Sequence, residues 1–78
     1  MATKAFVLIE TAVGKTREVV AALLTMEGMK SVDVVTGPYD IIAVVEGPDL
    51  GSIGDMVTGK IHTIGGIQRT VTCLAVSH

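Results

Sequence analysis

Six short segments with two different periodicities follow one another along the chain, and their order leaves few folds open. Four of them are runs of aliphatic, often β-branched residues, and this composition predicts strands. They occupy residues 3–10, 30–36, 41–46 and 67–77. The other two segments carry apolar residues every three or four positions, which predicts amphipathic helices. The resulting order is β-α-β-β-α-β.

Turn and capping residues give the two helices their expected limits. The first helix is expected over residues 15–27, and Gly28 is suited to ending it. The second helix is expected to begin at Asp49 or Ser52, since either side chain can cap a first turn. The Gly65-Gly66 pair is expected to terminate it.

This order predicts an α+β, ferredoxin-like βαββαβ sandwich formed by a single domain, residues 1–78. Its four-stranded antiparallel sheet would carry both helices on one face. The strands at residues 3–10 and 41–46 are the most apolar, and this fold places its first and third strands at the centre of the sheet.

The strands are apolar on both of their faces. In the third strand, Ile41, Ala43 and Val45 point one way, while Ile42 and Val44 point the other. The first and last strands show the same pattern, although a sheet with one face in water normally alternates apolar with polar residues. Because two helices cover only one face, the other should be an exposed apolar patch of the kind that marks an interface. We therefore predict a homodimer that pairs through its sheet faces.

Composition excludes several classes of function. The net charge is −2, with six basic and eight acidic residues and no basic stripe, so direct nucleic-acid binding is not expected. No apolar run approaches the roughly 20 residues that span a bilayer, and the N-terminal residues lack a cleavable signal pattern, so we expect a cytoplasmic protein. With one cysteine and no Cys/His cluster, neither a disulfide within the chain, nor a metal, nor a cofactor is expected.

Two stretches partly match a phosphate-binding loop. Gly14-Lys15-Thr16 lies between a strand and a helix, but Ile9 stands where the motif requires a glycine. Residues 54–60 fit G-x-x-x-x-G-K but lie inside the second helix and are followed by Ile61 instead of Ser or Thr. Nucleotide binding is therefore not expected.

Few side chains are candidates for catalysis or ligand binding. Cys73 lies within an apolar strand and is expected in the core, and His62 is expected at a helix end, where a cation suits the dipole. Asp40 opens a very apolar strand beside the only tyrosine. It either bonds nearby backbone N–H groups, binds the amino group of a ligand or orders an interface. Thr70 and Thr72 share one face of the last strand, either for β propensity or as hydroxyl donors to a carboxylate ligand.

Two segments resemble one known family. Gly37-Pro38-Tyr39-Asp40, followed by an apolar strand, resembles the Gly-x-Tyr/His-Asp hallmark of the Lrp/AsnC transcriptional regulators. Residues 66–72, Gly-Ile-Gln-Arg-Thr-Val-Thr, resemble the Gly-Val-x-x-Thr-x-Thr ending of the same family. In a βαββαβ frame of this length, the two segments are similar to its C-terminal ligand-binding domain.

The resemblance implies a role and a site. Such domains dimerise through their sheets as a dimeric α/β barrel, assemble into rings of eight or ten chains, and bind amino acids or similar effectors between dimers. Carried over, Gly37, Tyr39, Asp40, Thr70 and Thr72 would line this crevice. The chain begins at its first strand, which implies a stand-alone form without the helix-turn-helix, acting with full-length relatives. The second helix departs from the family pattern by carrying Gly51, Gly54 and Gly59.

We therefore expect a non-enzymatic effector-binding and oligomerisation module that modulates transcription. Two alternatives stay open. The first is a purely structural adaptor whose Gly-Pro-Tyr-Asp turn shapes an interface without a ligand. The second is a small cofactor-independent ferredoxin-like enzyme, such as a monooxygenase, for which His62 would be the candidate catalytic residue.

Overall fold

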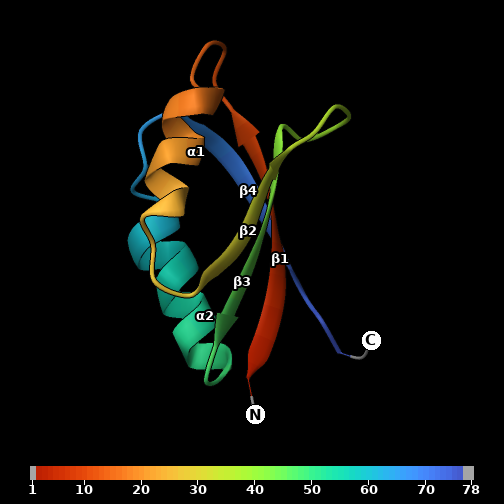
Figure 1. Ribbon diagram of the computed structural model, residues 1–78, viewed down its shortest axis with the longest axis vertical. Helices are drawn as coiled ribbons and strands as arrows, with labels where there is room; N and C mark the ends of the chain where they lie inside the picture. The colour runs from red at the N-terminus through yellow and green to blue at the C-terminus, as the bar shows by residue number, and fades with distance from the viewer. Residues whose placement is uncertain (1, 77–78) are drawn as a thin grey trace.

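A computed structural model describes residues 2–76 and has the predicted βαββαβ order (Figure 1). A π-helical turn, η1, continues the second helix. The elements are β1 (Thr3–Thr11), α1 (Thr16–Leu24), β2 (Met29–Val34), β3 (Ile41–Gly47), α2 (Leu50–Met56), η1 (Val57–Ile61) and β4 (Ile67–Leu74). The strands form one antiparallel sheet in the order β2-β3-β1-β4, so β3 and β1 are central as predicted. Both helices lie against the same face of this sheet (Figure 1).

The core lies between the helices and the sheet. Alternate residues of the two central strands are fully buried there, while Val19 and Leu23 of α1 and Ile53, Val57 and Ile61 of the second helical segment complete the core. The buried strand residues are Ala5, Val7, Ile9, Ile41, Ala43 and Val45. These are the positions that the two-residue periodicity assigns to one face, because successive side chains of a strand point to opposite faces.

The opposite sheet face, here called the open face, carries apolar side chains, and no helix within residues 2–76 lies over it (Figure 1). Phe6 pairs with Val44 on one side and with Cys73 on the other, and Leu8 pairs with Ile42 and Val71. Phe6 and Val71 each retain 36% exposure. Cys73, which we expected in the core, is exposed on this face, because its register opposite Phe6 directs it away from the helices.

The first helix and the last strand each end three residues earlier than expected. The first helix ends at Leu24 instead of residue 27, because the Thr25 hydroxyl and backbone N–H both bond back to the Ala22 carbonyl and close the last turn. The last strand ends at Leu74, although the Ala75 N–H still donates to the Lys4 carbonyl over 2.9 Å. Ser77, the expected last residue of that strand, lies outside the described residues.

The second helical segment begins where the sequence predicts and ends earlier. The Asp49 carboxylate accepts a hydrogen bond from the Ser52 backbone N–H over 2.8 Å, so Asp49 is the N-cap of the two candidates expected. Helical geometry stops at Ile61, four residues before Gly65, after the π turn in which the His62 N–H donates to the Val57 carbonyl over 2.9 Å. No helix within residues 2–76 is long and apolar enough to cross a membrane.

Candidate functional site

Asp40 joins the start of β3 to the end of β1. Its Oδ2 accepts hydrogen bonds from the Thr11 backbone N–H over 2.8 Å and from the Thr11 hydroxyl over 3.2 Å, and the Asp40 N–H donates to the Ile9 carbonyl. Thr11 Oγ1 lies 2.8 Å from Thr16 Oγ1, which extends this network to the first turn of α1. One carboxylate oxygen therefore orders the corner where β1, β3 and α1 meet.

Tyr39 lies beside this corner and contacts a side chain of β4. The Arg69 guanidinium donates to the Tyr39 hydroxyl over 3.1 Å and lies 5.7 Å from the centre of its ring. Arg69 pairs with Glu10 of β1, so its side chain crosses β1 to reach the turn before β3. This contact brings a cation, a phenol and the Asp40 carboxylate to one end of the sheet.

Thr70 is held by a different partner. Its Oγ1 lies 2.7 Å from Nε2 of His62, the residue that follows the π turn. Thr70 pairs with Ile9 and Thr72 with Val7, so the two threonines share the helix-covered face of β4, as their spacing predicts. Because β4 lies at the edge of the sheet, Thr70 is only half-buried and Thr72 is exposed.

A shallow hollow lies beside Thr70. It has a volume of about 320 Å³ and is lined by His62, Ile67, Gln68, Arg69 and Thr70. Its walls provide an imidazole, an amide, a guanidinium and a hydroxyl, so it is suited to a small polar molecule with a carboxylate. Gly37 lies away from it, exposed in the turn between β2 and β3 with a φ of 149°.

One chain thus divides the five expected ligand-binding residues between two places. Gly37, Tyr39 and Asp40 lie in the turn before β3, whereas Thr70 and Thr72 lie on β4, with β1 between the two strands. Arg69 connects the two places by its contact with Tyr39. Sequence reasoning assigned no binding role to Arg69 or Thr11, although the position of Arg69 next to Thr70 in the motif could have indicated it.

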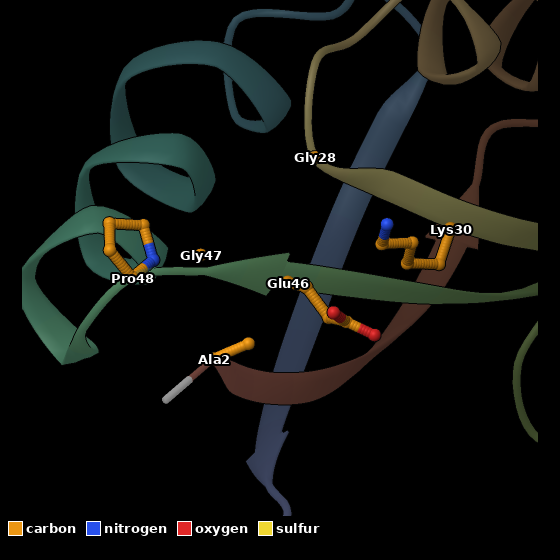
Figure 2. Close-up of a pocket in the computed structure, with 6 residues that line it drawn as sticks. All are labelled: Ala2, Gly28, Lys30, Glu46, Gly47 and Pro48. Atoms are coloured by element: carbon orange, nitrogen blue, oxygen red, sulfur yellow. The ribbon is translucent and has the colours of Figure 1, made fainter.

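Two further hollows lie at the other end of the sheet. Ala2, Gly28, Lys30, Glu46, Gly47 and Pro48 line the one in Figure 2, with a volume of about 410 Å³. A hollow of about 500 Å³ shares Gly28, Glu46, Gly47 and Pro48 with it and extends along α2 and η1 to Lys60. Both are open, and their charged groups have both signs: Lys30, Lys60, Glu27, Glu46 and Asp55.

The two glycine-lysine stretches have ordinary structural surroundings. The Lys15 ammonium lies 3.6 Å from the Glu18 carboxylate on α1, and the residues from Gly54 to Lys60 form helical turns. Residues 2–76 contain no group of three or more His, Cys, Asp or Glu side chains that could hold a metal ion.

A family model described as the Lrp/AsnC ligand binding domain matches residues 4–78. The chain belongs to the Lrp/AsnC ligand-binding domain family. No match is found among the curated proteins. The sequence resemblance to this family, carried by the Gly-Pro-Tyr-Asp turn and the Thr-x-Thr strand, is confirmed.

Solved structures of similar length support this family assignment. FFRP-DM1 is 42% identical with a TM-score of 0.91, and the match covers 95% of this chain and 99% of that one. A hypothetical protein from Pyrococcus horikoshii is 41% identical with a TM-score of 0.89, and the match covers 100% and 93% of the two chains.

A more distant structure shares the fold of this Lrp/AsnC domain. It is a transcriptional regulator from Neisseria meningitidis in complex with L-Met, 17% identical with a TM-score of 0.88. The match covers 97% of this chain and 51% of the regulator, so this chain corresponds to about half of that protein.

Proposed function

We propose that this Lrp/AsnC domain is a stand-alone module that binds an amino acid or a similar small effector and assembles into a ring, without catalysing a reaction. It would act in the cytoplasm on transcription through full-length Lrp/AsnC partners and would not bind nucleic acid itself. The domain family and the L-Met complex of the Neisseria meningitidis regulator support this class of ligand.

One observation carries the proposal: the groups that suit an amino acid lie on two separate strands, with Thr70 level with the end of the sheet that holds Tyr39 and Asp40, and Thr72 two residues further along β4. Tyr39 and Asp40 offer a phenol and a carboxylate, and Thr70 and Thr72 offer hydroxyls. A crevice formed where two dimers meet would bring the Tyr39 turn of one copy to the β4 threonines of another. The site would then be complete only in the assembly, with eight or ten chains in the ring.

The open face supports the first step of this assembly. It offers a continuous apolar surface across the two central strands and β4, namely Phe6, Leu8, Ile42, Val44, Val71 and Cys73. Covering this surface with the same surface of a second copy would remove it from water, at roughly 25 cal/mol of stabilisation per Å² of apolar area. A homodimer that pairs through the sheet faces would bury the open faces of both copies at the same time.

A thermal-shift screen of the twenty amino acids tests the proposal. An amino acid that binds only the folded protein adds about 2.7 kcal/mol of stability at one hundred times its Kd, which raises the unfolding temperature. Tyr39→Phe and Thr70→Val should each weaken binding about tenfold, since each removes one hydroxyl from a polar contact. Thr3→Val, at the far end of β1, is the matched control and should bind like the wild type.

Asp40→Ala is a poorer probe than these two variants. Its carboxylate accepts the Thr11 N–H, so removing it would weaken the fold together with any binding. If no amino acid at millimolar concentration raises the unfolding temperature, effector binding is refuted. The structural adaptor, for which the use of Asp40 in an internal hydrogen bond is the supporting observation, would then be the better assignment.

A further inference from the structure

Arg69 is a cation beside Tyr39 that its own chain leaves largely unpaired. Its cross-strand partner on β1 is Glu10, yet no carboxylate within residues 2–76 forms an ion pair with it. The one hydrogen bond that its guanidinium makes within these residues goes to the Tyr39 hydroxyl over 3.1 Å. A guanidinium carries several N–H donors in a planar fork, so most of them are free to bind a further group.

Tyr39 restrains this guanidinium. The Tyr39 hydroxyl accepts from Arg69, and the guanidinium carbon lies 5.7 Å from the centre of the Tyr39 ring, which is within the range of a cation–π contact. An arginine side chain loses much rotamer freedom when a ligand orders it. Because Tyr39 already restrains Arg69, a ligand that binds it here should lose less conformational entropy on binding.

The free donors suit the carboxylate of an amino acid. A guanidinium can bind both oxygens of a carboxylate at once through two parallel hydrogen bonds, which makes this pair strong and selective. Arg69 also lines the hollow beside Thr70. The amino group of the ligand is a cation, which Arg69 would repel. That group suits Asp40, since only Oδ2 of this carboxylate is used in the bonds from Thr11.

We propose that Arg69 binds the carboxylate of the effector and thereby selects molecules that carry one. The inference rests on the proposed effector function and adds a binding residue to it. In the assembled crevice, Arg69 would approach the carboxylate from the Tyr39 turn of its own copy. The β4 hydroxyls of another copy would complete the contacts.

The experiment compares each amino acid that binds the wild type with its α-amide, in thermal-shift titrations at about pH 6.5, where the amide keeps a protonated amino group. The wild type should bind the acid about tenfold or more tightly than the amide, because hydrogen bonds between charged groups are stronger. Arg69→Gln should bind both with about the same affinity, and Arg69→Lys should keep part of the preference. Arg17→Gln, which replaces an exposed arginine of α1, is the matched control and should keep all of it.

The outcomes separate this inference from the proposed function. If the wild type binds acid and amide equally well, Arg69 does not bind the carboxylate, while effector binding stands. An Arg69→Gln variant with the full wild-type preference for the acid overturns the inference in the same way. If that variant also unfolds at a lower temperature without ligand, Arg69 only stabilises the Tyr39 turn. If no amino acid binds the wild type, effector binding and the inference are overturned together.

Discussion

Gly28 shows how little room there is between β2, β3 and α2. Its φ is 88°, which side chains rarely adopt, and a Cβ placed there would lie 2.6 Å from Met56 Cε and 2.8 Å from the Glu46 carbonyl oxygen. The methionine end can move, but the Glu46 carbonyl belongs to a central strand. Only glycine therefore satisfies both the backbone conformation and the contact.

Replacing Gly28 by alanine is expected to cost about 2 kcal/mol or more of unfolding free energy, because backbone strain and a backbone clash add. Gly54→Ala is the matched control. Gly54 lies inside α2 with nothing within 4 Å of its added Cβ, so alanine there should stabilise by up to about 1 kcal/mol. Urea unfolding followed by circular dichroism measures both. Equal effects of the two substitutions would contradict this account.

The sequence predicted which residues belong to the site, but it did not predict which side chains they contact. The motif pointed to Asp40, Tyr39 and Thr70, yet the partners of these side chains lie eight to thirty positions away in the sequence. Such contacts depend on strand register and on a bulge between Glu10 and Thr11, which no local pattern encodes. The internal use of Asp40 and the pairing of His62 with Thr70 could therefore only be seen in three dimensions.

Among the elements, α2 depends most on its first residues. It has seven residues and contains Gly51 and Gly54, each of which lowers helix stability by roughly 1 kcal/mol relative to alanine. The Asp49 cap and the burial of Ile53 offset this weakness. Asp49→Ala should destabilise the domain by about 1 kcal/mol, since it leaves the Ser52 N–H without its acceptor.

Asp55→Ala is the control for the cap, because Asp55 is an exposed carboxylate on the same helix. It should change the unfolding free energy by less than about 0.5 kcal/mol. Both variants can be compared by urea denaturation at one pH. A loss at Asp55 as large as at Asp49 would indicate a general charge effect instead of a capping bond.

The element order and the central strands followed from the sequence, because the local spacing of apolar residues encodes them. The cap of α2 was narrowed to Asp49 or Ser52, and the structure identifies Asp49. The end of α1 and the π turn did not follow from the sequence. Apolar residues continue to Met26, so periodicity alone carries the helix past Leu24, where Thr25 closes it. Val57 and Ile61 keep the four-residue spacing of an α-helix, so their pattern gives no sign of a π turn.

At the scale of the whole molecule, the two faces of the sheet differ: the helices pack on one face, and the other is the open face. Stable interfaces bury roughly 1,200 Å² or more in total, and the open face of two central strands and β4 offers a surface for such burial. The protein is expected to be a dimer or larger at micromolar concentration. Light scattering coupled to size-exclusion chromatography measures this, and a wild-type monomer would refute pairing through the sheet.

Val44→Glu tests which surface pairs. Val44 lies on central strand β3 opposite Phe6. In a dimer paired through the open faces, a carboxylate at this position would be buried against apolar side chains or against the same carboxylate of the second copy. The cost of burying this unpaired charge should dissociate the dimer. Leu24→Glu is the control, since Leu24 is 63% exposed at the end of α1 on the other side of the molecule. Leu24→Glu should leave the mass of the oligomer, measured by light scattering, unchanged. Circular dichroism checks that both variants stay folded.

The strand order also sets when the sheet can form during synthesis. Central strand β1 leaves the ribosome first, yet its pairing with β4 joins Ala5 to Leu74. Until β4 emerges, one edge of an apolar strand has no partner, and an unpaired edge of this kind is prone to aggregation. Contacts so distant in sequence also slow folding, because the intervening chain must close first. The nascent chain is therefore expected to be most prone to aggregation before its last strand is complete.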